Sequence, residues 1–419
     1  MNRPLVSIVV PVFNAEEYLH QTLNCICNQD YENIEIIISD NASSDNTKNI
    51  ILDYAKQDPR IKYYFHNENK GAAWNYNFTV EKSSGDYFKW AAYDDLFATN
   101  YISACVTQFE LSPEAVLIYG KTLLLDEYNT FYAYYDDNLH LTLEHPHQRL
   151  YRLIEILARC NPVFGLMKRS TMLETNLIGS YISSDRVFLA EMVLRGHFIE
   201  LPDYLFFRRL HSEISTSANK NNTELLNWFK TKNKTSLLSF LYKRFPALNL
   251  YLQNCISILK HDSELKEKRL CFSRLNKATF NSQKTKSNTL NQRIAKFNLE
   301  QLGQSYLNIV ENINSGEFTQ GLAKCNEILE LNPWNPDLLH YRASIFLKKN
   351  SLDQAKTDID KALLIKPLEA SFNNTAGLIY KSLGNNDKAM QFYDKSLSIK
   401  PDYKEAQYNR DILLELKEQ

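Results

Sequence analysis

The sequence predicts an α/β domain built on a mostly parallel sheet, followed by an all-α array of short helices. Three observations support this fold class. Between positions 5 and 119, apolar β-branched runs alternate with stretches of helical spacing, which is typical of βαβ units. Between positions 231 and 300 the composition becomes basic and polar. After that, prolines recur every 34 residues, at Pro333, Pro367 and Pro401, each after an apolar helical stretch.

The chain as a whole has the composition of a globular protein with two or three domains. It has 419 residues, of which 44% are hydrophobic and 23% charged, and its net charge of −1 gives no reason to expect a nucleic-acid partner. No apolar run reaches the roughly 18 residues that span a bilayer, and we interpret the run at Leu5–Phe13 as a strand rather than a signal peptide. The seven cysteines show no CxxC pair, which favours a reducing, cytoplasmic location without disulfides or structural zinc.

Four parallel strands are expected in the first 95 residues, with helices between them. The strands are Leu5–Phe13, Ile34–Asp40, Ile61–Phe65 and Tyr87–Ala92. Asn14 is expected to cap the first helix with Glu17 as its capping-box partner, and Asp45 or Ser44 to cap the second. Gly71 opens the third helix, which runs to about Glu81.

The next hundred residues continue with alternating elements and one irregular stretch. The expected elements are a helix at Asn100–Phe109, a strand at Ala115–Tyr119, a helix at Gln148–Arg159, a strand at Pro162–Met167, a helix at Ser183–Arg195, and extended segments at Phe198–Leu201 and Leu205–Arg208. The irregular stretch from Leu123 to His147 is interpreted as an edge hairpin, with an acceptor-binding loop as the alternative.

Two of the expected strands end abruptly in carboxylates. Ile34–Ser39 is followed by Asp40, and the run Tyr87–Tyr93 is followed by Asp94 and Asp95. In open α/β sheets the ligand crevice lies just outside the carboxyl ends of the strands. The sequence therefore predicts a ligand site at this edge of the sheet.

The segment 231–300 is strongly basic, with 14 Lys and Arg against 4 Asp and Glu. Ser236–Tyr242 and Leu248–Leu259 have helical apolar spacing, and the polar stretch Phe272–Asn291 suits a linker. Two interpretations stay open. The basic excess is either a solvated helical face with a linker, or a peripheral contact with an anionic membrane surface.

The C-terminal part resembles the tetratricopeptide repeat, a helical hairpin with a period of 34 residues. Ala343 and Gly377 are 34 residues apart, as are Ala355 and Ala389, and small residues let two helices approach closely. Three units and a capping helix are expected: Leu302–Asn335, Pro336–Glu369, Ala370–Lys400 and Asp402–Glu418. The resemblance implies a concave face for a protein partner. The expected domains are thus 1–220, 221–300 and 301–419.

The N-terminal part resembles the family 2 glycosyltransferases, which have the nucleotide-diphosphosugar transferase (GT-A) fold. Six motifs in the same order support the resemblance between about Leu5 and Ser217. They are PVFN (Pro11–Asn14), SDNASSDNT (Ser39–Thr47), DPRI (Asp58–Ile61), NKGAAWNYN (Asn69–Asn77), SGDYFKWAAYDD (Ser84–Asp95) and SSDRVFLAEMVLRG (Ser183–Gly196).

The resemblance implies a nucleotide-sugar donor held by residues of the first motifs. Asp40 would accept a hydrogen bond from a uracil-type base, and Phe13, where the family commonly has Tyr, would pack on it beside the Pro11 main chain. Asn14 and Lys70 are further candidates for contact with the donor. The structural alternatives are core packing for Phe13 and a turn or cap role for Asp40.

The resemblance also implies a divalent metal and a general base. Asp95 would bind Mn²⁺ or Mg²⁺ with His211 as a further ligand, and Asp94 would face the ribose or a bridging water. Arg208 would pair with phosphate. Asp185 would deprotonate the acceptor, although Ser184 stands where the family often has Glu; its alternative is an ordinary acid in the first turn of a helix.

These residues imply a metal-dependent, inverting transfer of a sugar from a nucleotide-diphosphate donor, expected to be a UDP-sugar. The acceptor would be a hydroxyl of a glycan, a lipid-linked glycan or a protein, in a bacterial cell-surface polysaccharide pathway. The alternative is a transferase-like domain without turnover that acts as a scaffold through its repeats.

Overall fold

The computed structural model describes residues 3–126, 129, 131–211, 245–281, 294–296, 308–331 and 334–418. The chain divides into two compact units. The first comprises residues 1–124 and 133–295, and the second comprises residues 125–132 and 296–419. The predicted boundaries at 220 and 300 stay a prediction, because the residues around both lie outside the described ranges.

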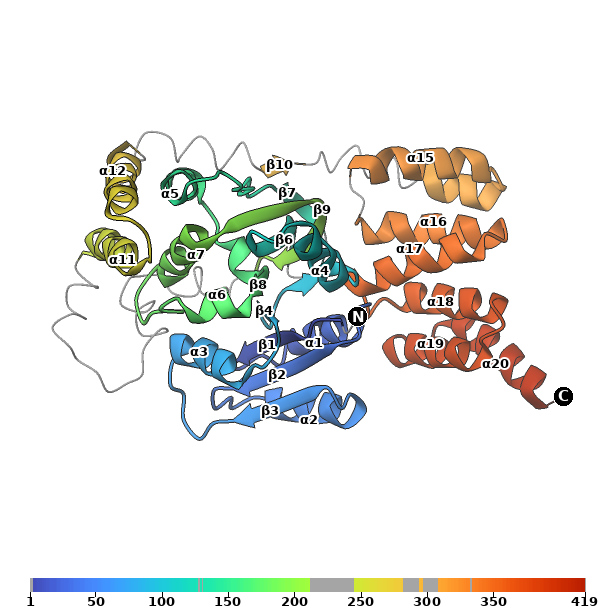
Figure 1. The fold of residues 1–419 in the computed structure, drawn as a ribbon. Helices are drawn as coiled ribbons and strands as arrows, with labels where there is room; N and C mark the ends of the chain where they lie inside the picture. The colour runs from blue at the N-terminus through green and yellow to red at the C-terminus, as the bar shows by residue number, and fades with distance from the viewer. Residues whose placement is uncertain are drawn as a thin grey trace. The chain divides into compact units, whose positions relative to one another are not determined.

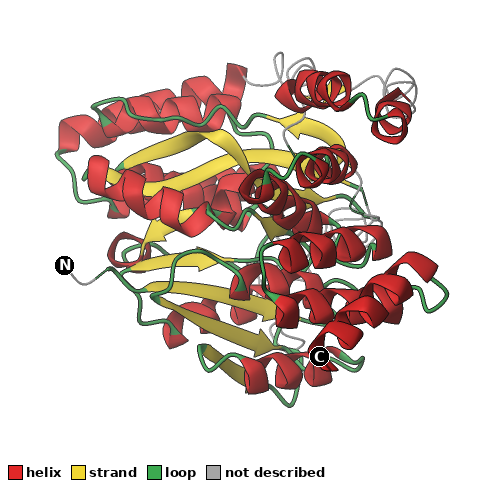
Figure 2. Cartoon of the chain, turned by 90° about the vertical axis from the view of Figure 1, so that its right-hand side faces the viewer, coloured by secondary structure: helices red, strands yellow, loops and turns green. Residues whose placement is uncertain are grey.

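The first unit is built on the predicted parallel strands. They are β1 (Val6–Val12), β2 (Ile34–Asp40), β3 (Ile61–Phe65) and β4 (Tyr87–Trp90), in the order β4-β1-β2-β3 (Figures 1 and 2). Every residue of β1 and β2 is buried, which explains their mostly apolar sequence. The buried Ser7 donates a hydrogen bond of 2.6 Å to Glu35 Oε1 on the neighbouring strand. Val12 pairs with Asp40, so the carboxyl ends of β1 and β2 lie side by side.

Antiparallel strands extend the sheet beyond β4. β8 (Leu166–Lys168) lies between β4 and β6 (Ala115–Leu125), which is followed by β7 (Phe131–Tyr135) and β10 (Ile294–Lys296). β9 (His197–Arg209) pairs with β6 and with β5 (Leu96–Phe97). The sheet is therefore mixed, and β1 lies where the strand order reverses.

Between residues 3 and 211, helices connect the strands of this unit. They are α1 (Leu19–Cys27), α2 (Thr47–Gln57), α3 (Ala72–Lys82), α4 (Tyr101–Leu111), α5 (Pro146–Ile156), α6 (Arg169–Leu173) and α7 (Ser184–Arg195). α3 packs against β1 and β2, and α7 packs against α5. The core between sheet and helices includes Trp90 and Phe188, whose rings are 5.3 Å apart.

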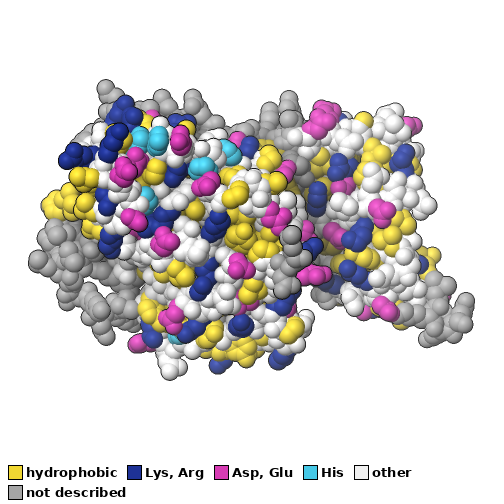
Figure 3. Space-filling view, viewed as in Figure 1, with side chains coloured by type: hydrophobic (Ala, Val, Ile, Leu, Met, Phe, Trp, Pro, Cys, Tyr) yellow, Lys and Arg dark blue, Asp and Glu magenta, His cyan; other side chains and the backbone are white. Residues whose placement is uncertain are grey.

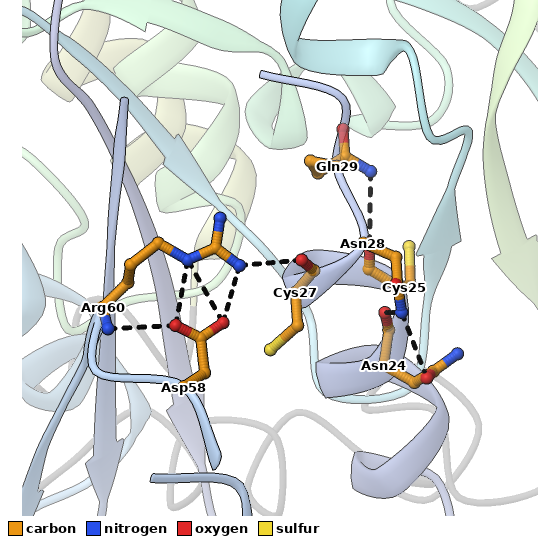
Figure 4. A network of polar contacts seen from close by, with 7 residues as sticks. All are labelled: Asn24, Cys25, Cys27, Asn28, Gln29, Asp58 and Arg60. Atoms are coloured by element: carbon orange, nitrogen blue, oxygen red, sulfur yellow. Dashed lines mark hydrogen bonds and ion pairs between the residues drawn. The ribbon is translucent and has the colours of Figure 1, made fainter. Parts of the chain in front are cut away.

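The DPRI motif has a structural role in this unit (Figure 4). The guanidinium of Arg60 donates to both carboxylate oxygens of Asp58, and its Nη2 also donates to the carbonyl oxygen of Cys27 at 2.8 Å. Cys27 is the last residue of α1, so its carbonyl has no partner within the helix. Arg60 thus attaches the end of α1 to the turn that precedes β3.

Three local predictions were wrong. Asn14 does not cap α1, which begins only at Leu19. The segment Pro162–Met167 is a 3₁₀ helix at Asn161–Phe164 followed by β8, because Pro162 occupies the first turn of the short helix. The second helix is not capped by Asp45 or Ser44, because α2 begins at Thr47 and Asn46 occupies the cap position. The two segments predicted as extended after Gly196 are extended, and both lie within the single strand β9.

Two further helices, α11 (Pro246–Lys260) and α12 (Leu265–Asn281), belong to the first unit. α12 runs through part of the stretch predicted as a linker, because Cys271, Leu275 and Ala278 lie on one face of the helix and are buried. It packs against α5, and α11 packs against α7. The predicted helix at Ser236–Tyr242 and the rest of the predicted linker lie outside the described residues.

The second unit is the predicted array of helical hairpins, drawn in orange to red in Figure 1. Its described residues include a helical segment at 308–315, followed by α15 (Phe318–Leu331), α16 (Pro336–Lys348), α17 (Leu352–Ile365), α18 (Ala370–Ser382), α19 (Asn386–Ile399) and α20 (Lys404–Glu418). A Cβ on Gly377 would collide with the ring of Tyr393, so the small residue permits the α18–α19 contact. No helix of the described parts of the chain is both long and apolar enough to cross a membrane.

Candidate functional site

The predicted site residues lie at the carboxyl ends of three neighbouring strands. Phe13 follows β1, Asp40 is the last residue of β2, and the turn containing Asp94 and Asp95 follows β4. β1 lies between β2 and β4, which is the point where the strand order reverses. Ligands of open α/β sheets bind at such points.

Asp40 and Phe13 differ sharply in exposure. Asp40 is buried, and its Oδ1 accepts hydrogen bonds from the backbone nitrogen and the hydroxyl of Ser43, at 3.0 and 2.5 Å. Part of its carboxylate therefore orders the loop after β2, which is the turn role given as its alternative. Phe13 is 41% exposed, so core packing does not account for it. Its ring is available to a flat ligand, whereas the adjacent Pro11 is buried in β1.

Asn14 and Lys70 are both engaged with the protein. Asn14 has a positive φ of 48°, and it exchanges hydrogen bonds with the loop after β2: its nitrogen donates to Ser43 Oγ and its Oδ1 accepts from Ser44 nitrogen. The backbone nitrogen of Lys70 donates to Asn41 Oδ1, and its Nζ lies 4.5 Å from the ring centre of Trp74. Asn14 thus joins the loops after β1 and β2.

The acidic turn after β4 is partly withdrawn from solvent. Asp95 is only 6% exposed, and its Oδ1 accepts a hydrogen bond of 2.9 Å from the backbone nitrogen of Arg209. Burial, and then the neighbouring Asp94 carboxylate, raise the pKa of Asp95 to about 7. Asp94 Oδ2 lies 3.0 Å from His211 Nε2, and this contact raises the pKa of His211.

Arg209 organises the acidic turn, a role that the sequence did not reveal. Its buried guanidinium donates to the carbonyl oxygen of Asp94 and to Gln21 Oε1 at 2.7 Å, and it lies 4.3 Å from the ring centre of Tyr18. Residues on a strand alternate between faces, so Arg208 and Arg209 must point in opposite directions. The alternation was visible in the sequence, but the face toward the turn was not.

Arg208 heads a second polar network. Its Nη1 donates to Asn161 Oδ1 at 2.6 Å, and Asn161 Nδ2 donates at 3.1 Å to both Thr122 Oγ1 and Asp137 Oδ2. Burial raises the pKa of Asp137 to about 7, and the charge of Arg208 lowers it in part. Arg208 also lowers the pKa of Asp95, so its positive charge acts on the acidic turn as well.

Asp185 lies in the first turn of α7, as predicted. Its Oδ1 accepts from the backbone nitrogen of Arg186 at 2.9 Å. The Tyr76 hydroxyl links Asp185 electrostatically to the acidic turn. Burial raises the pKa of this hydroxyl most, and the carboxylates of Asp94, Asp95 and Asp185 raise it further. Three of the four carboxylates predicted as site residues therefore act electrostatically on the Tyr76 hydroxyl. The fourth, Asp40, lies at the end of the nearby strand β2.

The residues of the acidic turn suit a hard cation by type, but they do not form a complete metal site. Within the described ranges, no group of three His, Cys, Asp or Glu side chains is arranged as metal ligands. Two observations fit a cation beside Asp94. Burial and then the neighbouring Asp94 carboxylate raise the pKa of Asp95, and no described residue forms a hydrogen bond with the buried His211 Nδ1.

Comparison with known proteins identifies two regions. Residues 7–171 match the model of glycosyl transferase family 2, and residues 370–403 match a tetratricopeptide repeat model. An uncharacterized glycosyltransferase of Haemophilus influenzae is 37% identical over 126 residues, which are 30% of this chain and 50% of the relative. A GalNAc(5)-diNAcBac-PP-undecaprenol beta-1,3-glucosyltransferase of Campylobacter jejuni is 36% identical over 101 residues, which are 24% of this chain and 33% of the relative.

The chain spans half or less of the length of these two relatives. Among solved structures, TarS 1-349 of S. aureus in complex with UDP-GlcNAc aligns with a TM-score of 0.48 and 12% identity, over 95% of this chain and 93% of that chain. The sequence-based expectations for the two ends of the chain are confirmed. The chain contains a family 2 glycosyltransferase domain at its N-terminal end and a tetratricopeptide repeat toward its C-terminal end.

Proposed function

We propose that the chain is a metal-dependent, inverting glycosyltransferase that moves one sugar from a UDP-sugar to an acceptor hydroxyl. The observation that supports this most is that the carboxylates of Asp94, Asp95 and Asp185 all raise the pKa of the Tyr76 hydroxyl, and that Asp40 and Phe13 lie at the ends of β2 and β1 beside β4. Such a transfer needs a bound base, a neutralised diphosphate and a proton acceptor. The three requirements correspond to three parts of this site.

The donor would lie across the ends of β1, β2 and β4. Phe13 offers an exposed ring to the base, and Asp40 has a second carboxylate oxygen beside the Ser43 turn for the base N–H. Mn²⁺ or Mg²⁺ would be held by Asp95 and Asp94 with His211 beside them, and it would supply positive charge to the leaving diphosphate. Arg208 would add a second positive charge.

Asp185 would act as the general base. The helix N-terminus favours its ionised form, which is the form that takes a proton from a hydroxyl. A single displacement with the base on one side of the sugar and the diphosphate on the other inverts the anomeric centre. The nucleoside diphosphate would leave from the acidic turn, where a cation held by Asp95 and Asp94 would offset its charge.

The acceptor would be a glycan, a lipid-linked glycan or a protein, in the assembly of a bacterial cell-surface polysaccharide on the cytoplasmic side. The relative from Campylobacter jejuni has an undecaprenol-linked glycan in its name, which supports the lipid-linked class. The helical repeats would bind a protein, either the acceptor or another member of the assembly.

Asp185→Asn tests the proposal, with the exposed Asp203→Asn as a matched control on β9. We expect Asp185→Asn to lower the transfer rate by about 10²- to 10⁴-fold while leaving the affinity for the UDP-sugar nearly unchanged. Asp203→Asn should alter neither. Full transfer by Asp185→Asn would contradict the mechanism, and a wild-type chain that binds no nucleotide sugar would favour a scaffold function instead.

A further inference from the structure

Helix α11 exposes a stripe of large apolar side chains, although Ile258 on its buried side already packs in the core. Its buried positions include Asn249, Asn254 and Ser257. Its outward positions, together with the residue before the helix, are large and apolar: Phe245 (49% exposed), Leu248 (51%), Leu252 (47%), Ile256 (40%) and Leu259 (60%). The spacing of these residues predicted a helix, but a helix of a globular protein normally turns such a stripe inward.

The outward orientation of these apolar side chains is supported by specific contacts. At 100° per residue the five exposed side chains fall within about 80° of the helix circumference, so they form one continuous stripe, defined here as the α11 stripe. On the opposite side Ser257 donates to Glu191 Oε1 of α7 at 2.7 Å, and Asn254 Nδ2 donates to the carbonyl oxygen of Leu250. The second bond lies within α11, so the Ser257 contact with α7, together with Ile258 in the core, fixes the rotation of the helix.

The charges near the α11 stripe are more basic than acidic, because residues 245–281 contain six Lys and Arg against Asp262, Glu264 and Glu267. Helix α11 itself contains no Asp or Glu, and α12 contains five Lys and Arg but one acidic residue, Glu267. Glu267 forms an ion pair with His147 Nδ1 at 2.8 Å, so its charge is engaged within the protein. In Figure 3, hydrophobic and basic side chains lie side by side at the left edge, where Figure 1 shows α11 and α12.

We propose that the α11 stripe docks on an anionic lipid membrane, with the apolar side chains in the interface and the neighbouring Lys and Arg on the headgroups. An apolar stripe with basic flanks on a helix lying in the surface plane is the chemistry of interfacial membrane binding. A second copy of the chain fits less well, because pairing two stripes would bring two basic surfaces together.

This inference does not depend on the proposed transfer reaction. It rests on the exposure of α11 and on charge, and none of the site residues takes part. Docking would attach the first unit to the membrane surface through α11.

The test is co-sedimentation of the full chain with vesicles. Vesicles of phosphatidylglycerol and phosphatidylcholine in equal amounts should bind the chain, binding should weaken with added salt, and vesicles of phosphatidylcholine alone should bind much less. The triple variant Leu248→Ser, Leu252→Ser, Leu259→Ser should bind at least about tenfold more weakly.

A matched triple variant changes exposed leucines elsewhere on the same unit, Leu111→Ser, Leu143→Ser and Leu173→Ser, and it should bind like the wild type. Thermal melts of both variants check that they fold. Equal binding of the two triple variants, or no binding of the wild type to anionic vesicles, would overturn the proposal. So would light scattering that shows a dimer of the wild type that is lost in the α11 variant.

Discussion

Replacing Asp95 by Asn should stabilise the protein at alkaline pH in the absence of metal. The carboxyl is buried beside Asp94, and its pKa rises from 3.8 to about 7 in the folded chain. Between these two pH values the unfolded chain releases the proton while the folded chain keeps it, so stability falls as the pH rises through this window. Asn keeps the oxygen that accepts from Arg209 nitrogen but has no charge to bury.

The magnitude follows from the size of the window. A difference of about 3 pH units corresponds to about 4 kcal/mol of unfolding free energy above pH 7. The new buried amide NH₂ costs about 1–3 kcal/mol if it finds no partner. The expected net gain is therefore about 1–3 kcal/mol at pH 8, or a rise of several degrees in Tm.

The assay is a thermal melt of wild type, Asp95→Asn and the control Asp203→Asn at pH 8 and pH 5. The advantage of Asp95→Asn should shrink by more than half at pH 5, because the wild-type carboxyl is then protonated in the folded chain. Added Mn²⁺ at pH 8 should raise the Tm of the wild type and leave that of Asp95→Asn nearly unchanged. Equal melting of the two proteins at pH 8, with equal responses to Mn²⁺, would refute the reasoning.

Three further predictions follow from other contacts. Arg209→Lys should lower the free energy of unfolding by about 2–3 kcal/mol in urea titrations, because the acidic turn loses charged hydrogen bonds. Arg208→Lys should lower it less but raise the KM for the donor. Equal losses of stability in the two variants would contradict the different roles given to Arg208 and Arg209. Phe13→Ala should weaken UDP binding about tenfold in calorimetry without a comparable loss of stability, since the ring is exposed. Gly377→Ala should destabilise the helical array by about 1–3 kcal/mol through collision with Tyr393, while UDP affinity stays the same; an unchanged unfolding transition would show that the helices can separate.

Some features of the fold were accessible from sequence because local chemistry decides them. The buried strands β1 and β2 are mostly apolar, and β2 ends in a carboxylate while two carboxylates follow β4, at the end of the sheet where ligands bind. The helical array was predicted from the spacing of small residues and prolines, and its hairpins occur at the predicted positions. In these cases one stretch of sequence contains the whole signal.

Other features depend on what lies across a contact. The spacing of Leu248–Leu259 indicates a helix but not its rotation, which is fixed by Ser257 and Glu191, 66 residues apart. Which of Arg208 and Arg209 faces the acidic turn depends on how β9 lies next to β5 and that turn. Asn14 has the residue type of a helix cap, yet its side chain is engaged by the loop after β2. Long-range partners decided each of these outcomes.

The proposed function requires that the acidic turn hold a cation against the donor diphosphate. The most direct test is calorimetric titration of UDP into the wild type and into Asp95→Ala, with and without Mn²⁺. We expect strong binding of UDP only for the wild type with Mn²⁺. Equal binding without the metal, or equal binding by Asp95→Ala with it, would contradict the claim.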